Sequence, residues 1–132
     1  MTKQEIYREI EQQFGFVPLF IKALPDDSLE SDWLNIKMTQ FGDSGSIPAK
    51  YKQLAGLAVA AATKDEHCVL WHTEMAKAKG ATDEEIREIL RCVYDTVGWG
   101  VVLKGVALDY GEFKRELQRM EDYMSSKQKT SV

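Results

Sequence analysis

The chain has 132 residues, 44% of them hydrophobic and 29% charged, and its 17 basic and 21 acidic side chains give a formal charge of −4. This composition is typical of one globular domain, and the acidic excess argues against nucleic acid or an anionic membrane as the main partner. The N-terminus lacks the apolar core of a secretory signal, and the longest uncharged apolar stretch (53–63) is shorter than the roughly 20 residues that span a bilayer. Since two cysteines cannot build a disulfide framework either, a cytoplasmic protein is predicted.

The N-terminal residues predict an amphipathic helix with a defined start and end. Thr2 and Glu5 are spaced as a capping box, in which each side chain accepts a hydrogen bond from the backbone N–H of the other residue. The apolar side chains that follow recur at i, i+4 and i+8: Ile6, Ile10 and Phe14. Gly15 is expected to end this helix, because glycine readily adopts the left-handed conformation of a C-cap.

Two further helices are predicted before the first clear loop. Pro18 begins a short one that runs to Pro25, since proline is well tolerated in the first turn. Asp27 or Ser28 caps the next. Its apolar side chains are Leu29, Trp33, Ile36 and Phe41. Residues 42–46 consist mainly of glycine and serine and are predicted to form a loop.

The helix that begins at Pro48 has a different character. Between residues 54 and 62 every residue is apolar or glycine, so this helix has no polar face. A helix that is apolar all round is buried on all sides, either within its own chain or against another copy. The next helix is predicted over residues 65–79 and ends at Gly80.

The C-terminal part is predicted to be helical as well. Thr82 and Glu85 form a second capping box. One face of its helix carries Ile86, Leu90, Val93 and Val97. Glycines at 98, 100, 105 and 111 are expected to divide the remaining apolar run, and residues 125–132 to form a frayed, flexible tail. Because no stretch alternates with period 2, we expect one all-α domain over residues 1–132, with six to eight helices.

The motifs of common enzyme classes are absent from the sequence. Residues 98–100 (Gly-Trp-Gly) lack the third glycine of a dinucleotide-binding loop, and no GxSxG, HExxH or paired CxxC motif occurs. Lysines and arginines do not cluster with aromatic residues as they do in nucleic-acid-binding proteins. The sequence therefore predicts no cofactor and no metal.

One segment, residues 64–72, contains both histidines of the chain and one of its two cysteines. On a helix Cys68 and His72 are one turn apart, and Asp65 at the N-cap would place Cys68 in the first turn. The helix N-terminus and a nearby imidazole favour a thiolate, whereas the negative charge of Asp65 disfavours it. The sequence does not determine which of these effects on the ionisation of Cys68 is larger.

Purely structural roles also account for these residues. Cysteine often packs as a small hydrophobic side chain, which would make Cys68 inert and explains Cys92 among its apolar neighbours. Asp65 is fully explained as an N-cap, and His72 as a hydrogen-bonded helix residue. A metal site of Cys68 and His72 with His67 or Asp65 would lack the usual spacing of four ligands.

Three segments carry a resemblance to a known family: residues 47–63, 67–76 and 80–86. Their order and spacing resemble the carboxymuconolactone decarboxylase and alkylhydroperoxidase D (AhpD-like) superfamily over residues 45–108. The most specific element is Cys68-x3-His72, and the Gly-Ala-Thr-x-Glu-Glu-Ile segment at 80–86 supports it. The resemblance implies an all-α fold that assembles as homotrimers or homohexamers, with active sites near the subunit contacts.

The chain departs from the family pattern at two positions. The peroxidase branch carries Cys-x2-Cys-x3-His preceded by a glutamate, and its second cysteine attacks peroxide while its first resolves the sulfenate as a disulfide. Here Cys68 and His72 match the second cysteine and the histidine, whereas Asp65 stands in place of the first cysteine and Gln53 in place of the glutamate. The resemblance thus implies an attacking thiol without its resolving partner and without the acid–base carboxylate.

Three functions are compatible with this pattern. The first is a one-cysteine, antioxidant thiol oxidoreductase with peroxiredoxin-like activity, in which Cys68 attacks a peroxide, His72 assists proton transfer, and an external thiol or Cys92 resolves the product. The second is the cofactor-free chemistry of the decarboxylase branch on a small carboxylated or lactone substrate. There His72 acts as general acid or base, and Asp65 or His67 orients it or the substrate. The third is a non-catalytic oligomer with an eroded site.

Overall fold

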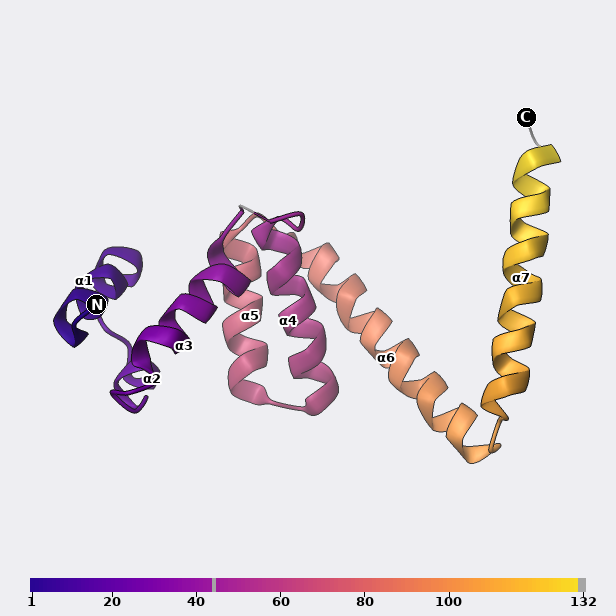
Figure 1. The fold of residues 1–132 in the computed structure, drawn as a ribbon, viewed down its shortest axis with the longest axis horizontal. Helices are drawn as coiled ribbons and strands as arrows, with labels where there is room; N and C mark the ends of the chain where they lie inside the picture. Colours follow the sequence, from indigo (N-terminus) through magenta and orange to yellow (C-terminus); the bar gives the residue numbers. More distant parts are fainter. Residues whose placement is uncertain (44, 131–132) are drawn as a thin grey trace. The chain divides into compact units, whose positions relative to one another are not determined.

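A computed structural model describes residues 1–43 and 45–130, so Ser44 of the predicted loop lies outside the described residues. The described residues form seven α-helices and one π-helix and contain no strand, which confirms the all-α prediction (Figure 1). The elements are α1 (Lys3–Phe14), α2 (Leu19–Lys22), α3 (Leu29–Ile36), the π-helix η1 (Lys37–Phe41), α4 (Ala49–Thr63), α5 (Glu66–Ala78), α6 (Asp83–Gly105) and α7 (Tyr110–Thr130). They divide into two compact units, residues 1–90 and 91–132, and the single domain stays a prediction.

Helix α1 begins and ends as the sequence predicts. The Thr2 hydroxyl accepts a hydrogen bond from the Glu5 N–H at 3.2 Å, and the Glu5 carboxylate accepts one from the Thr2 N–H at 2.7 Å. Gly15 ends the helix in the left-handed conformation, with φ of 83°. The apolar stripe of α1 packs into a core that consists of Ile6, Ile10, Val17, Ile21, Leu29 and Trp33. This core joins α1, α2 and α3.

The helices between residues 18 and 41 differ from the prediction in length and type. Helix α2 ends at Lys22 rather than near Pro25. Ser28 precedes α3 but makes no side-chain hydrogen bond to the N–H groups of the helix. After Ile36 the predicted third helix changes into the π-helix η1.

Contacts with α4 stabilise this π-helix. The Lys52 ammonium donates to the carbonyls of Met38 and Gly42 at 3.3 and 2.8 Å, and the Gln53 amide nitrogen donates to the carbonyl of Gln40 at 3.0 Å. The carbonyls at the end of η1 therefore find partners on a distant helix instead of within their own. Local sequence signals do not reveal such contacts, which is why the sequence predicts an ordinary helix here.

Helices α4 and α5 form a pair joined by a tight turn (Figure 1). Lys64 makes this turn in the left-handed conformation, with φ of 57°, and Asp65 caps α5. The core beneath the pair consists of Leu54, Leu57, Ala76, Ala81 and Ile86. The pair thus places residues 64–72, with Cys68 and both histidines, at the N-terminal end of α5.

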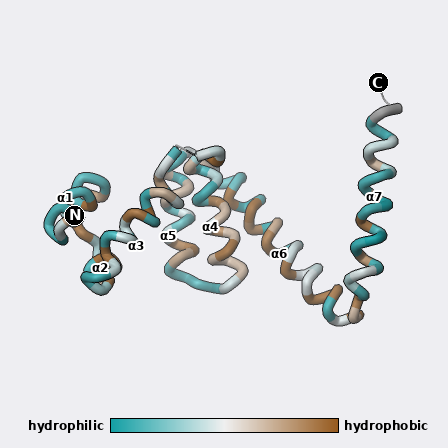
Figure 2. The backbone as a smooth tube through the Cα atoms, in the orientation of Figure 1, coloured by the Kyte–Doolittle hydropathy of each residue, from teal (hydrophilic) through white to brown (hydrophobic). Residues whose placement is uncertain are grey.

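Helix α4 is not buried on all sides within one chain. Leu54, Leu57 and Ala60 lie in the interior, whereas the Val59 side chain is 65% exposed. Figure 2 shows that the residues of this helix are largely hydrophobic. Burial of the exposed side against another copy stays a prediction.

Helix α6 begins at the predicted capping box but is longer than expected. The Thr82 and Glu85 side chains accept hydrogen bonds from each other's N–H groups at 3.0 Å. The helix continues through Gly98 and Gly100 as far as Gly105, which corrects the prediction that these glycines divide the segment. Each glycine lowers helix stability by about 1 kcal/mol relative to alanine, too little to interrupt a long helix.

The second unit exposes its apolar side chains. None of the residues described from 91 to 128 is buried. Its exposed large hydrophobic residues are Tyr94, Val97, Trp99, Val101, Val102, Val106, Leu108, Tyr110, Phe113, Leu117, Met120, Tyr123 and Met124. Residues 125–130 of the predicted frayed tail continue α7, and residues 131–132 lie outside the described residues. Among the helices described, none combines the length and apolar character that crossing a membrane requires.

Candidate functional site

The N-terminus of α5 positions Cys68 in the way the sequence predicts. Asp65 is the N-cap, and its carboxylate accepts a hydrogen bond from the Cys68 N–H at 3.1 Å. Cys68 therefore lies in the first turn, where its side chain is exposed. This exposure contradicts the interpretation of Cys68 as an inert core residue.

The surroundings of Cys68 disfavour the thiolate form of its side chain. Hydrogen bonding to the Asp65 carboxylate raises the pKa of the Cys68 thiol, and desolvation and the negative charge of Asp65 act in the same direction. The pKa of Asp65 itself is lowered, mainly because its carboxylate accepts the hydrogen bond from the Cys68 backbone. The carboxylate thus remains ionised beside the thiol and opposes a second negative charge.

Removing the charge of Asp65 is expected to make Cys68 more reactive. In Asp65→Asn the amide oxygen still caps α5, so the thiol should become ionised at lower pH and react about two- to fivefold faster with iodoacetamide at pH 7. The rate is measured in a Cys92→Ser background, in which Cys68 is the only thiol. Glu66→Gln is the matched control, because it removes an equal charge from the same turn. Equal rates in Asp65→Asn and the parent protein would contradict this account.

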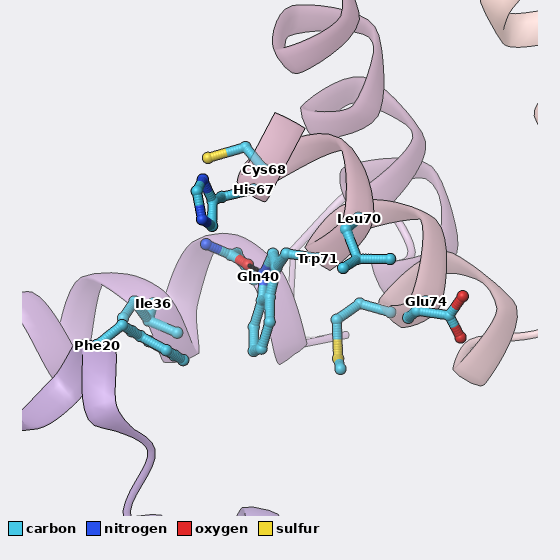
Figure 3. Close-up of a pocket in the computed structure, with 9 residues that line it drawn as sticks. Phe20, Ile36, Gln40, His67, Cys68, Leu70, Trp71 and Glu74 are labelled. Carbon is cyan, nitrogen blue, oxygen red and sulfur yellow. Dashed lines mark hydrogen bonds between the residues drawn. The ribbon is translucent and has the colours of Figure 1, made fainter. Parts of the chain in front are cut away.

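Cys68 lines a pocket of about 530 Å³ within the first unit (Figure 3). Apolar side chains make up most of its wall, among them Phe20, Ile36 and Trp71. The polar groups on this wall come from Gln40, His67 and Glu74. A pocket with an apolar wall and a few polar groups fits a small molecule with an apolar body.

His72 lies in a different environment, between α5 and α4. Its Nδ1 is 2.8 Å from the Oε1 of Gln53, which is fully buried. The Nε2 of Gln53 donates to the carbonyl of Gln40, so the amide oxygen must be the atom that faces the histidine. An amide oxygen only accepts, hence the Nδ1 of His72 carries the proton and its Nε2 is unprotonated.

Partial burial disfavours the charged form of the His72 imidazole. Desolvation lowers the pKa of His72 from its ordinary value of 6.5, because burial disfavours the charged form. The ring lies directly on the backbone of Gly56, where a Cβ would come within 2.6 Å of Nδ1 and Nε2. Gly56 therefore allows the close approach of the two helices that this geometry requires.

The lowered pKa of His72 predicts a pH-dependent stability. Since the unfolded chain binds a proton more readily than the folded one, the free energy of unfolding should decrease as the pH falls below about 6.5. His72→Asn, which can donate the same hydrogen bond to Gln53 without titrating, should reduce this dependence. The measurement is urea denaturation between pH 5 and 7.5 at fixed protein concentration, with the exposed His67→Asn as the control. A dependence of equal size in His72→Asn would contradict the assignment.

The structure thus separates the predicted site residues into two groups. Asp65, His67 and Cys68 lie at the start of α5, and the latter two line the pocket, whereas Gln53 and His72 meet between the helices. His72 is not among the residues that line this pocket. Cys68 and His72 are neighbours on one helix, as predicted, but they face different surroundings.

Cys92, Gln40 and Trp71 lie outside these two groups of residues. Cys92 is exposed in the chain, which corrects its interpretation as a packing residue. Within residues 1–43 and 45–130, no three side chains of His, Cys, Asp or Glu gather as a metal site requires. Gln40 and Trp71 belong to the site but carry no sequence signal, since their contact depends on the π-helix.

The chain is similar in sequence to known proteins. A family model described as the carboxymuconolactone decarboxylase family matches residues 29–109, beginning before the predicted segment 45–108. An alkyl hydroperoxide reductase of Mycobacterium tuberculosis is 35% identical over 81 residues, which make up 60% of this chain. The chain spans only 23% of the length of that relative.

A solved structure shows the same fold. The alkylhydroperoxidase AhpD core from Rhodospirillum rubrum matches with a TM-score of 0.72 and 22% sequence identity, and the match covers 80% of each chain. At this identity the likeness concerns the fold, which is all-α and AhpD-like in both chains.

Proposed function

Because this chain belongs to the carboxymuconolactone decarboxylase family, we propose that it is a thiol-dependent hydroperoxide reductase with Cys68 as the attacking thiol. The observation that carries the proposal is the exposed Cys68 in the wall of an apolar pocket. An organic hydroperoxide could place its carbon skeleton against Phe20 and Trp71 and its peroxide oxygens near the sulfur. The similarity to an alkyl hydroperoxide reductase supports this substrate class.

The proposed reaction is one oxygen transfer. The thiol of Cys68 loses its proton to solvent, and the sulfur attacks the terminal oxygen of the hydroperoxide. The S–O bond forms as the O–O bond breaks, and the electron pair leaves on the second oxygen, which takes up a proton to give an alcohol. Cys68 is oxidised to a sulfenic acid, and the peroxide is reduced.

An external thiol would complete the cycle. Asp65 stands where the family's resolving cysteine is expected, so no thiol of the same turn can condense with the sulfenic acid. A small thiol would attack the sulfenic sulfur and release water, and a second would reduce the mixed disulfide and restore Cys68. The raised pKa of Cys68 predicts that the peroxide reaction accelerates as the pH rises above neutral.

The test is single-turnover oxidation of the reduced Cys92→Ser protein by cumene hydroperoxide. We expect sulfenic acid at Cys68, detected by trapping and mass spectrometry, with a rate constant above that of free cysteine. Cys68→Ser should abolish the reaction and leave the helical circular dichroism unchanged. If Cys68 reacts no faster than free cysteine, the peroxidase proposal is wrong, and the non-catalytic interpretation gains support.

One observation favours a second candidate, the acid–base chemistry of the decarboxylase branch. The hydrogen bond to Gln53 fixes the tautomer of His72 and leaves Nε2 as a neutral base. In that case His72→Ala should abolish the turnover of a small lactone or carboxylated substrate, whereas Cys68→Ser should retain it. The opposite pattern would exclude this candidate.

We also propose that the chain assembles with copies of itself. The exposed side of α4 around Val59 and the apolar residues of the second unit support this, because exposed apolar surface of this extent is typical of interfaces. Light scattering after gel filtration should then give a mass that is a multiple of 15.0 kDa. A monomer at tens of micromolar would contradict it.

A further inference from the structure

The amide of Gln40 has a fixed orientation in the wall of the Cys68 pocket. The indole nitrogen Nε1 of Trp71 is 2.7 Å from the Oε1 of Gln40. An indole N–H can only donate, so the atom that it meets must be the amide oxygen. The amide nitrogen Nε2 therefore points the other way, toward the part of the pocket that His67 and Cys68 line (Figure 3).

This amide nitrogen is available to a ligand. Among the described residues it donates to no side chain or backbone group. Gln53, the other amide near the site, already uses both of its polar ends, on His72 and on the Gln40 carbonyl. Gln40 thus offers an unused N–H donor on a wall that is mostly apolar.

Trp71 is itself held in place by aromatic contacts. Its ring makes edge-to-face contacts with Phe14, Phe20 and Phe41 at centroid distances of 5.9, 5.4 and 6.2 Å. Such contacts restrict the ring, and the ring in turn restricts the amide that accepts from it. The donor on Gln40 is therefore positioned before any ligand enters.

We propose that Gln40 is a catalytic residue of the hydroperoxide reaction, and that its Nε2 donates a hydrogen bond to the peroxide oxygen that leaves as Cys68 attacks. This inference rests on the proposed function. Negative charge develops on that oxygen when the O–O bond breaks, and a donor fixed in advance stabilises it without reorganisation. Trp71 is a positioning residue, because it acts only through the orientation of the Gln40 amide.

The experiment compares two reactions of the same thiol. In the Cys92→Ser background, Gln40→Met replaces the amide with a side chain of similar length that donates no hydrogen bond. The backbone carbonyl that binds Gln53 is retained, so the arrangement at His72 should persist. We expect the rate constant with cumene hydroperoxide to fall about tenfold or more, as when a catalytic donor is removed. The rate of alkylation by iodoacetamide and its pH profile should change less than twofold, because alkylation creates no oxyanion.

Trp71→Phe tests the positioning role. Phenylalanine keeps an aromatic ring in the cluster but removes the N–H, so the amide of Gln40 can adopt both orientations. With the donor presented about half of the time, the peroxide rate should fall only about twofold. A loss larger than that of Gln40→Met would overturn the assignment of roles.

The outcomes separate this inference from the proposed function. If Cys68 of the parent protein reacts with peroxide faster than free cysteine but Gln40→Met reacts equally fast, the function stands and the role of Gln40 is wrong. If peroxide and alkylation rates fall by the same factor, Gln40 acts on the thiol or the fold, and the inference is overturned as well. If the parent protein fails to react, both are wrong.

Discussion

Replacing Gly56 with alanine is expected to lower the free energy of unfolding by about 1–3 kcal/mol and to expel the imidazole of His72 from its place between α4 and α5. A Cβ at Gly56 would lie 2.6 Å from both ring nitrogens, so the ring must move. Alanine stabilises a helix interior by about 1 kcal/mol relative to glycine, which offsets part of the loss. The steric term and the lost hydrogen bond to Gln53 together exceed this gain.

Urea denaturation and the NMR signals of His72 measure the two effects of Gly56→Ala. Ala55, the preceding residue, is exposed, so Ala55→Gly calibrates the helix propensity of α4 without a steric contact. Gly98→Ala in α6 is the opposite control, since its Cβ would meet nothing within 4 Å. That variant should be more stable by about 0.5–1 kcal/mol. An equal gain in Gly56→Ala would show that the imidazole does not rest on this glycine.

Replacing Gln53 with leucine is expected to lower the free energy of unfolding by about 2–4 kcal/mol. Gln53 is fully buried and satisfies two groups, the Nδ1–H of His72 and the carbonyl of Gln40. Leucine has a similar volume but leaves both groups without partners, and an unsatisfied buried polar group is destabilising. Urea denaturation at pH 7 measures the loss.

Gln53→Glu is the matched variant, since it changes one amide into a carboxylate of the same size, the group that the resemblance to the peroxidase branch implies at this position. A carboxylate accepts from His72 but cannot donate to Gln40, and its charge favours the imidazolium. The pKa of His72 should therefore rise in Gln53→Glu, in contrast to its lowered value in the natural chain. A histidine titration by NMR that is unchanged in this variant would contradict the hydrogen bond between the two side chains.

The part of the site that the sequence predicts consists of contacts between residues close together in the chain. Asp65 caps α5 and places Cys68 in the first turn because the capping contact spans only three residues. Both capping boxes are confirmed for the same reason. Because these contacts join residues only three positions apart, they can be predicted from the sequence alone.

The remaining contacts depend on how distant helices pack. Cys68 and His72 share a stripe of α5, yet the former lines a pocket with side chains from α2 and α3, and the latter rests on α4. Gln40, in the π-helix η1, contacts both surroundings. Its side chain accepts a hydrogen bond from Trp71 in the pocket wall, and its backbone carbonyl accepts one from Gln53 beside His72. No periodicity reveals these pairs, because they are separated by 13 to 31 positions in the chain.

The cap at Asp65 has an evolutionary consequence. The same carboxylate that anchors the first turn of α5 raises the pKa of the neighbouring thiol, so helix stability and thiol reactivity are opposed at one position. A lineage under selection for faster chemistry would have to give up this cap or replace it with a neutral one. A lineage that keeps it retains a sulfur that is less reactive toward electrophiles outside the pocket than it would be beside a neutral cap.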